Sequence, residues 1–357
     1  MADRQDADDA ALAARLAGRL TALIDIPSPS RDEGALAAYV LEALGQLARD
    51  AGDRCVVTGP QTRGNRPLVL LAGHLDTVPE QGNLPSHRAG GTVFGLGAAD
   101  MKGALAVMIE LALTAPENSV FDLGLVFFPR EELPFGDTAL SPLLDREPGL
   151  RTADLAIVME PTAGAVQLGC LGNLNATWTI GGSAGHSARP WLADNAIERA
   201  ARAIAALPAE PADHVFAGLT YREVVSPVMV RGGIARNVIP DSCTVELNHR
   251  YAPGTSAADA EAALRGWCEP HGTLTIDGNA PSGAVPSGNA IAERLIAITA
   301  RPAEPKQAWT PVAEFALAGI EAVNFGPGDP AYAHRRDEQV GEQALVECYR
   351  ALERLLF

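Results

Sequence analysis

Apolar runs with the character of buried strands end repeatedly in acidic or imidazole side chains. Three such runs lie in the first half of the chain and one lies near its end. In open α/β sheets, ligands bind beyond the carboxyl ends of the strands, so polar side chains at those ends are candidates for chemistry. In chain order the candidates are His74 and Asp76 after residues 67–73, Asp100 in the loop GLGAAD, Glu131 and Glu132 after residues 122–128, Glu160 after residues 153–159, and His334 after residues 321–326.

This set of side chains suits a pair of zinc ions. Two histidines and three or four carboxylates supply nitrogen and oxygen ligands, and one carboxylate can bridge the ions. Two metals about 3.5–4 Å apart can activate one water and polarise a carbonyl together. One acid must stay off the metals to take the proton of that water. Adjacent Glu131 and Glu132 could divide these roles, and a cation would relieve the repulsion between converging carboxylates.

The elements that position these residues alternate between helix and strand. Apolar residues recur at helical spacing between the apolar runs, and this order predicts an α/β fold with a mostly parallel sheet flanked by helices. The expected helices cover residues 9–23, 34–48, 101–115, 288–300 and about 341–356, and the expected strands cover residues 67–74, 122–129, 153–160 and 321–328.

The middle of the chain has a different pattern. Strand-like and helical segments follow one another as β-α-β-β-α-β, which is the order of a ferredoxin-like unit. We therefore expect a lid or dimerisation domain at residues 173–282, inserted into a catalytic domain formed by residues 1–172 and 283–357. Its expected segments are 175–182, 194–207, 223–233, 242–251, 256–267 and 273–277.

The composition excludes several classes of partner. The 357 residues carry 44 acidic and 28 basic side chains, for a formal net charge of −16, whereas nucleic acids and anionic membranes require a basic face. Five scattered cysteines form neither a disulfide framework nor a CxxC metal site. The acidic start MADRQDADDA contains no apolar signal region. We expect a cytoplasmic protein with a small-molecule substrate and no nucleic-acid or membrane partner.

Several motifs resemble those of the di-zinc deacylase and carboxypeptidase family, which includes desuccinylases, deacetylases and aminoacylases. The resemblance covers residues from about 15 to 356. The motifs around the candidate ligands are GHLDTVP (73–79), GLGAADMKGALAVM (95–108), PREELPFG (129–136), VMEPT (158–162) and GPGDPAYAHRRDE (326–338). Within the inserted segment, the motifs that resemble the actinobacterial desuccinylase branch are GCLGNL (169–174), GHSARPWLADNAI (185–197), LTYRE (219–223), GGIARNVIPD (232–241) and NHRYAPG (248–254).

The resemblance implies two zinc ions per subunit, for which Co²⁺ can substitute. One ion would be held by His74 and Glu160, and the other by Glu132 and His334. Asp100 would bridge the two ions. Two candidates, Asp76 and Glu131, receive no ligand role, and the resemblance places them beside the metals.

The resemblance gives the remaining residues catalytic and binding roles. Glu131 would be the general base, and Asp76 would orient the imidazole of His74. His186 would reach the active site of the other subunit in a homodimer and stabilise the oxyanion. A cis peptide is expected between Asp100 and Met101. Substrate contacts are expected from Asn237, Arg250 and Thr310.

The implied reaction is hydrolysis of N-succinyl-LL-2,6-diaminopimelate to succinate and LL-2,6-diaminopimelate, in lysine and diaminopimelate biosynthesis. Related desuccinylases tend to have Asp and Arg in the segment where this chain has Pro311 and Glu314, and an acid in place of a base weakens recognition of an anionic substrate. Another N-acyl amino acid deacylase, such as an acetylornithine deacetylase, and an inactive metal-binding paralogue are therefore alternatives. A third is a serine hydrolase using Ser183, because residues 181–185 match G-x-S-x-G.

Overall fold

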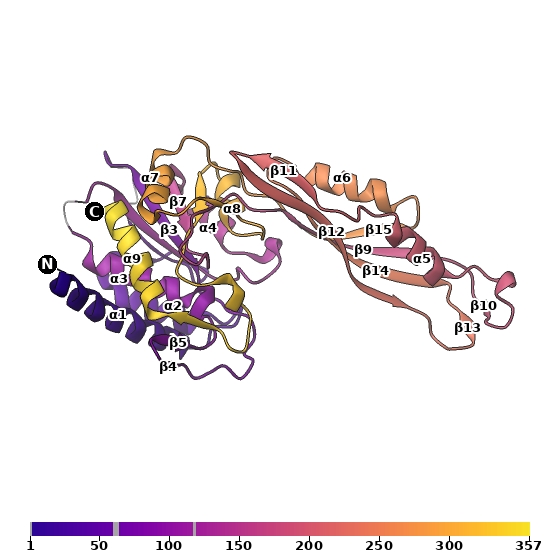
Figure 1. The fold of residues 1–357 in the computed structure, drawn as a ribbon, viewed down its shortest axis with the longest axis horizontal. Coiled ribbons are helices and arrows are strands. Elements are labelled where there is room, and N and C mark those ends of the chain that lie inside the picture. Colours follow the sequence, from indigo (N-terminus) through magenta and orange to yellow (C-terminus); the bar gives the residue numbers. More distant parts are fainter. Residues whose placement is uncertain (1, 60–63, 117–118) are drawn as a thin grey trace. The chain divides into compact units, whose positions relative to one another are not determined.

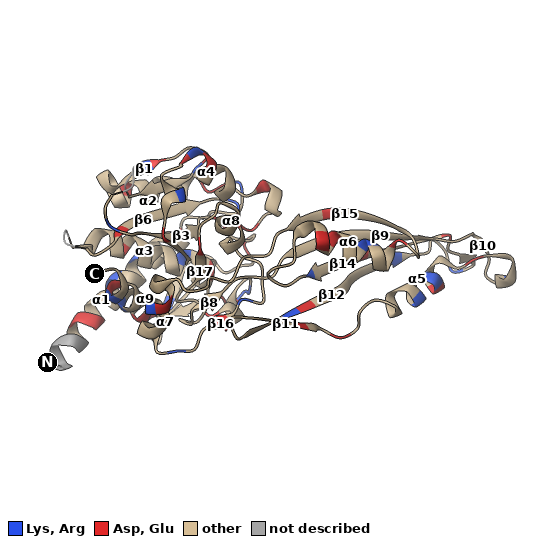
Figure 2. Cartoon of the chain, turned by 90° about the horizontal axis from the view of Figure 1, so that it is seen from above, with Lys and Arg blue, Asp and Glu red and all other residues tan. Residues whose placement is uncertain are grey.

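The computed structural model describes residues 2–59, 64–116 and 119–357. The chain forms two compact units (Figure 1). Unit 1 comprises Met1–Gly169, Pro286–Glu304 and Thr310–Phe357, and unit 2 comprises Cys170–Val285 and Pro305–Trp309. Acidic and basic residues are interspersed along the chain in both units (Figure 2).

An eight-stranded sheet forms the centre of unit 1, with the strand order β1-β2-β6-β3-β7-β17-β8-β16. Its four central strands are parallel, whereas β2 and β8 pair antiparallel with the outer two of these. The expected α/β fold is thus confirmed, but the short outer strands were not predicted. The strands are β1 (Ala48–Asp50), β2 (Val56–Thr58), β6 (Asp122–Phe128), β3 (Leu68–His74), β7 (Leu155–Val158), β17 (Ala322–Asn324), β8 (Gln167–Leu168) and β16 (Glu304–Pro305).

Helices cover this sheet because each has an apolar face to bury. In α1, Leu12, Leu16, Leu20 and Leu23 recur at intervals of three or four residues and are buried. This helix packs against α3 and α9, which lie beside it in Figure 1. The helices of unit 1 are α1 (Ala2–Ile24), α2 (Gly34–Leu44), α3 (Gly103–Thr114), α4 (Leu140–Arg146), α7 (Ala290–Thr299), α8 (Val312–Leu317) and α9 (Glu342–Leu356).

Four predicted helices are three or four residues shorter than expected, and two of these lie close to the candidate ligands or the sheet edge of unit 1. The helix predicted over 34–48 ends at Leu44, because Gly45 adopts φ 53° and breaks the helical path. The helix predicted over 101–115 begins at Gly103. Before it, the turn η2 (Ala98–Lys102) has non-helical backbone angles at Asp100 and Met101.

A small antiparallel sheet brings the C-terminal segment close to the first third of the chain. It contains β4 (His87–Ala89), β5 (Thr92–Phe94) and β18 (Gln339–Gly341), in the order β18-β5-β4. Because β18 directly follows the loop that carries His334, this pairing holds that loop beside η2, which carries Asp100.

Unit 2 has the predicted β-α-β-β-α-β order, and its strands form an antiparallel sheet in the order β11-β12-β14-β9-β15. Alternating residues of β9, including Trp178, are buried against the two helices. The edge strand β11 and the ribbon of β10 and β13 were not predicted. The elements are β9 (Asn173–Gly181), β10 (Gly185–His186), α5 (Ala196–Ala205), β11 (Ala212–Phe216), β12 (Leu219–Gly232), β13 (Val238–Ile239), β14 (Ser242–Arg250), α6 (Ala257–Cys268) and β15 (Thr273–Ala280).

Within the part of the chain that the structure describes, no helix has both the length and the apolar character needed to cross a membrane.

Candidate metal centre

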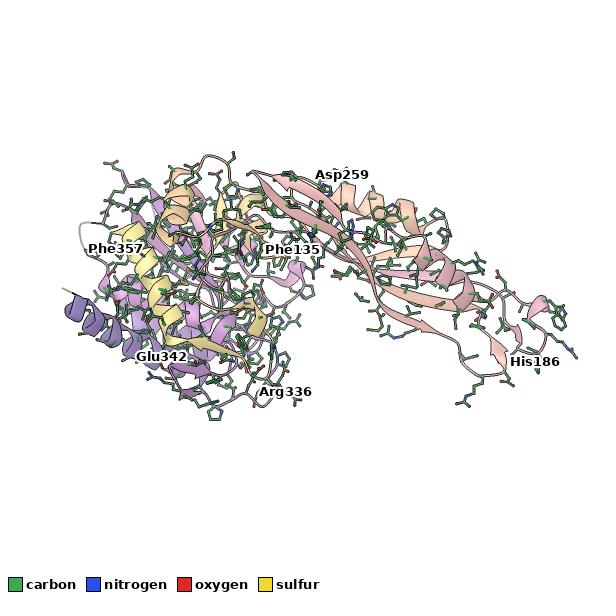
Figure 3. All side chains as sticks on the ribbon, in the orientation of Figure 1. Phe135, His186, Asp259, Arg336, Glu342 and Phe357 are labelled. Carbon is green, nitrogen blue, oxygen red and sulfur yellow. The ribbon has the colours of Figure 1, made fainter. Side chains whose placement is uncertain are left out.

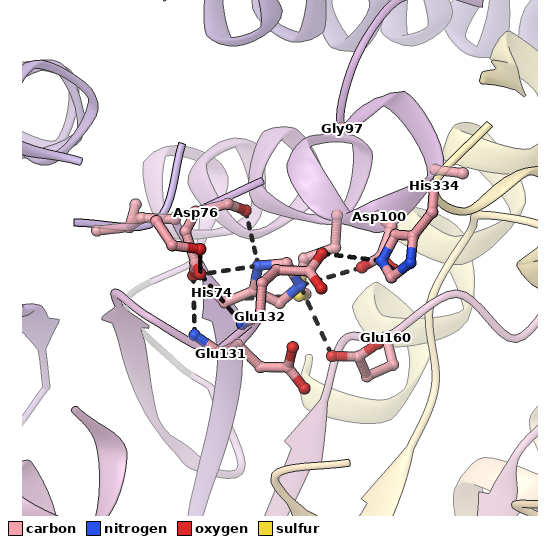
Figure 4. A network of polar contacts seen from close by, with 12 residues as sticks. His74, Asp76, Gly97, Asp100, Glu131, Glu132, Glu160 and His334 are labelled. Carbon is pink, nitrogen blue, oxygen red and sulfur yellow. Dashed lines mark hydrogen bonds and ion pairs between the residues drawn. The ribbon is translucent and has the colours of Figure 1, made fainter. Parts of the chain in front are cut away.

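The candidate ligands of unit 1 gather at the carboxyl ends of three parallel strands (Figure 4). His74 is the last residue of β3, Glu131 and Glu132 follow β6, and Glu160 follows β7. Ends of neighbouring parallel strands lie at one edge of a sheet, so the local sequence pattern suffices to bring these side chains together. Asp100 from η2 and His334 from the loop before β18 complete the cluster.

Asp100 lies between the two histidines. Its Oδ1 is 3.0 Å from Nε2 of His74, and its Oδ2 is 3.6 Å from Nε2 of His334. The Oε1 atom of Glu160 lies 3.8 Å from Nε2 of His74, and the Oε1 atom of Glu132 lies 3.0 Å from Nε2 of His334. Three overlapping groups of three side chains have their ligand atoms within 4.8 Å of one another. One is His74–Glu131–Glu132, and the other two are His74–Asp100–Glu160 and Asp100–Glu132–His334. The last two groups share Asp100.

The turn that carries Asp100 is held by a residue that sequence analysis missed. Glu338 is 2% exposed, and its carboxylate accepts hydrogen bonds from the backbone N–H groups of Gly97, Ala99 and Asp100 over 2.9, 3.1 and 2.9 Å. Burial raises the pKa of Glu338 to about 7 despite these bonds. The expected cis peptide between Asp100 and Met101 is present. No local pattern marks Glu338, because its partners lie more than 230 residues away.

Two glycines let the loop that carries His334 approach the other ligands closely. A Cβ at Gly326 would collide with the carbonyl oxygen of Met159, next to Glu160. A Cβ at Gly328 would likewise collide with the carbonyl oxygen of Ala99, next to Asp100. The backbone at His334 is left-handed, with φ 61°, a conformation that is costly for a residue with a side chain and must be held by the surrounding contacts.

Carboxylates dominate the electrostatics of this cluster. The hydrogen bond to Glu132 raises the pKa of His334 to about 9. Burial alone would lower the pKa of His74, but the hydrogen bond and the charge of Asp100 outweigh it and raise that pKa well above its usual range. Burial raises the pKa of Glu131, and the neighbouring carboxylates raise it further. A divalent cation would balance this excess of negative charge.

Asp76 makes different contacts from those expected of a residue that orients His74. The Nδ1 atom of His74 pairs with the backbone carbonyl of Asp76 over 2.9 Å, and the carboxylate lies 3.6 Å from it. That carboxylate instead accepts hydrogen bonds from the backbone N–H groups of Glu131 and Glu132 over 3.0 and 3.1 Å, and from the hydroxyl of Ser30 over 2.8 Å. Asp76 thus holds His74 in place through its backbone carbonyl, and it holds Glu131 and Glu132 in place through its side chain.

Three of the other predicted residues belong to unit 2. His186 is exposed at one end of this unit (Figure 3), and its Nδ1 accepts a hydrogen bond from the N–H of Ala188 over 3.1 Å. An acceptor Nδ1 places the proton of the neutral ring on Nε2, which is then a hydrogen-bond donor. Asn237 is also exposed, in the turn directly before β13. Arg250 ends β14, and its Nε donates to the side chain of Asn248 over 2.8 Å.

Glu314 does not present an exposed charge to a substrate. It is 1% exposed within α8, and its Oε1 accepts hydrogen bonds from the hydroxyl of Thr138 and from both the hydroxyl and the backbone N–H of Ser141. Burial raises its pKa. Thr310 is also buried, just before this helix. The acid at this position therefore faces the protein interior.

We expect Glu314→Gln to change the pH dependence of stability. The pKa of Glu314 is raised on folding, so its stabilising effect is complete at low pH and is lost as the pH rises through the folded-state pKa. Glutamine imitates the protonated acid and keeps an oxygen for the same donors. The melting temperature of the variant should match that of the wild type near pH 4 and exceed it by a few degrees at pH 8. A difference that does not vary with pH, or one also seen in the exposed control Glu347→Gln, would contradict this.

The serine-hydrolase alternative is wrong. A nucleophile elbow requires a helix directly after the serine, whereas Ser183 is followed by the short strand β10. Its hydroxyl oxygen accepts a hydrogen bond from the backbone N–H of Asp194 over 2.8 Å. The G-x-S-x-G match is therefore part of a structural loop.

The parallel strands of this α/β sheet end in a histidine and several carboxylates, and a loop adds a second histidine, which is an arrangement suited to a metal-dependent hydrolase. The chain belongs to peptidase family M20/M25/M40, whose model matches residues 70–357. It is 41% identical to a putative succinyl-diaminopimelate desuccinylase of Mycobacterium tuberculosis over 94% of this chain and 96% of that protein. It is 37% identical to the succinyl-diaminopimelate desuccinylase of Corynebacterium glutamicum, covering 94% of each chain.

Solved structures share this fold at low sequence identity. The aminopeptidase PepT of Bacillus cereus superposes with a TM-score of 0.78 at 18% identity, covering 96% of this chain and 98% of that one. A metallo-carboxypeptidase of the M20 family from Sulfolobus solfataricus gives a TM-score of 0.75 at 16% identity, covering 94% and 97% of the two chains. The expected family resemblance is thus confirmed.

Proposed function

We propose that this enzyme hydrolyses N-succinyl-LL-2,6-diaminopimelate to succinate and LL-2,6-diaminopimelate. The observation that carries the hydrolytic part is the position of Asp100 between two groups of ligands. The choice of substrate is supported by relatives that bear the name of this activity and match nearly the whole chain. A second candidate substrate is another N-acyl amino acid, because the family resemblance implies a base in the segment where this chain has Pro311 and Glu314.

The side chains of unit 1 fit two zinc ions. We assign His74 and Glu160 to one ion, Glu132 and His334 to the other, and Asp100 to both. Nitrogen and carboxylate oxygen are ligands that zinc accepts, and the negative charge of Asp100, Glu132 and Glu160 offsets most of the positive charge of two dications. When bound, such ions lower the pKa of a water molecule and polarise a carbonyl.

The remaining side chains would supply proton transfer and orientation. Glu131 would take a proton from the attacking water and deliver it to the leaving amine. The Nε2–H of His186 would donate a hydrogen bond to the developing oxyanion. Arg250 would pair with a substrate carboxylate through its planar guanidinium, and Asn237 and Thr310 would complete the contacts with the substrate.

A homodimer formed through unit 2 would protect an open sheet edge. On one side, residues 224–232 of β12 pair with β14. On the other side of β12, β11 pairs only with residues 219–223. Among the described residues, no strand pairs with that side of β12 beyond Glu223. Val228, Met229 and Val230 are 60%, 42% and 52% exposed in this segment. Pairing with a second copy would cover both the edge and these apolar side chains.

A cytoplasmic location of the enzyme stays a prediction.

Turnover measurements with a panel of N-acyl amino acids test the proposed function. The zinc-loaded enzyme should prefer N-succinyl-LL-2,6-diaminopimelate, lose its activity on treatment with a chelator and regain it with zinc or Co²⁺. Preference for N-acetylornithine or another acyl amino acid would support the second candidate. Absence of turnover on the whole panel by protein that retains zinc would show an inactive paralogue.

Glu338→Gln should weaken metal binding. The amide nitrogen that replaces one carboxylate oxygen cannot accept a hydrogen bond, so at least one backbone N–H of the Asp100 turn would lose its partner. Loss of a group that positions a metal ligand typically costs about 10–100-fold in metal affinity. Zinc affinity is measured by competition with a chromophoric chelator, and circular dichroism checks the fold. An unchanged affinity in a folded variant would show that Glu338 does not position Asp100.

A further inference from the structure

The loop that carries Glu131 and Glu132 is tied to the edge of the sheet by an ion pair with no role assigned above. Arg130 donates from Nη1 and Nη2 to the two carboxylate oxygens of Asp53 over 2.9 and 2.6 Å. Its Nε donates to the backbone carbonyl of Asp137 over 2.8 Å. One guanidinium therefore joins the start and the end of this loop to the turn between β1 and β2, where Asp53 lies.

The backbone is left-handed at both ends of this ion pair. The φ angles of Arg130, Asp53 and Arg54 are 66°, 54° and 62°, in a region that is unfavourable for residues with a Cβ. Such strain persists only where surrounding contacts enforce it, and it concentrates at functional sites. The strained β1–β2 turn directs Asp53 to Arg130. It directs the neighbouring Arg54 to Glu33, whose carboxylate is fully buried and lies 2.8 Å from the guanidinium of Arg54.

We propose that Arg130 and Asp53 form a positioning clamp for the two glutamates that follow. Arg130 directly precedes Glu131, so the conformation that the clamp imposes on Arg130 sets the direction in which the chain continues. The backbone N–H groups of both glutamates then meet the carboxylate of Asp76. The clamp also opposes the repulsion that would drive Glu131 and Glu132 away from the other carboxylates of the cluster.

This inference rests on the proposed function, in which Glu131 is the general base and Glu132 a zinc ligand. Neither Arg130 nor Asp53 would touch the substrate or a metal. Their effect on the reaction would arise through the orientation of the glutamates, because a displacement of about 1 Å can cost on the order of 10²-fold in rate.

Hydrogen exchange tests the clamp without reference to turnover. In the protein as purified, the amides of Glu131 and Glu132 should exchange at least about tenfold faster in Arg130→Gln and in Asp53→Asn than in the wild type. The matched control is Arg49→Gln, because Arg49 forms an equally bidentate pair with Glu147 at 2.7 and 2.7 Å. Exchange at the two glutamates should be unchanged in that control. Unchanged exchange in Arg130→Gln and Asp53→Asn overturns the proposal.

Steady-state kinetics with the zinc-loaded enzyme give the second readout. We expect kcat to fall about 10–100-fold in Arg130→Gln and in Asp53→Asn, with KM within about threefold and a loss of melting temperature no larger than in Arg49→Gln. The double variant should lose no more than either single variant, because the two residues act as one unit. A kcat within about twofold of the wild type in both single variants overturns the proposal.

Arg130→Gly separates the side chain from the backbone. Glycine adopts the left-handed conformation without strain, so this variant keeps the backbone path but lacks the guanidinium. We expect the same loss of kcat as in Arg130→Gln, and full activity would overturn the clamp. If the wild type fails to hydrolyse the succinylated substrate, the proposed function fails, whereas hydrogen exchange still decides whether the clamp holds the turn.

Discussion

Replacing Glu131 by Gln is expected to lower kcat by about 10²–10⁴-fold, the usual contribution of a general base, while both metals stay bound. The variant removes the charge that would accept the proton of the attacking water but keeps the size of the side chain. Its backbone N–H still donates to the carboxylate of Asp76, so the turn should keep its shape. Zinc content and kcat, measured on the same preparation, give the two quantities needed.

The neighbouring variant Glu132→Gln is the matched control for this experiment. Glu132 lies 3.0 Å from Nε2 of His334, and with Asp100 and His334 it forms one of the two ligand groups that share Asp100. Its replacement should therefore weaken zinc binding, and the rate should partly recover at high zinc concentration. Loss of zinc from Glu131→Gln in step with its activity would instead make Glu131 a ligand.

His186→Ala should lower kcat by about 10²–10³-fold, the typical effect of removing one oxyanion donor. His186 lies in unit 2, whereas every proposed metal ligand lies in unit 1. In a two-fold homodimer formed through unit 2, we expect His186 to serve the active site of the other subunit. The domain motion that closes such a site would exclude water from it.

Mixing two nearly inactive variants tests this arrangement. After subunit exchange between His186→Ala and Glu131→Gln, half of the dimers contain one subunit of each kind, and each mixed dimer has one site with both residues intact. Activity should recover to roughly a quarter of that of the wild type if the sites are shared. Failure to recover after exchange has been verified by native mass spectrometry would show that His186 acts within its own chain or does not act in catalysis. A mixture of His186→Ala with His186→Asn serves as the control, which should stay inactive.

Local patterns in the sequence were sufficient to predict the α/β fold and to place most of the candidate ligands at one edge of its sheet. An uninterrupted apolar run such as residues 68–73 predicts a buried parallel strand, and the residue that ends it must lie at the edge of the sheet. The positions of His74 and Glu160 at the edge of the sheet therefore follow from the apolar runs that precede them in the sequence. The order of alternating strands and amphipathic helices likewise predicted the topology of unit 2.

Only the tertiary structure decided which side chains hold the candidate ligands in place. Glu338 contacts the Asp100 turn from 238 residues away, and the Arg130–Asp53 pair spans 77 residues. Glu314 faces Thr138 and Ser141 in the protein interior, although its place in the motif suggested a contact with substrate. Such contacts depend on how separate elements pack, and the same acidic residue can end a strand, hold a backbone turn or bind a metal. The partner that determines its role therefore becomes evident only in the folded chain.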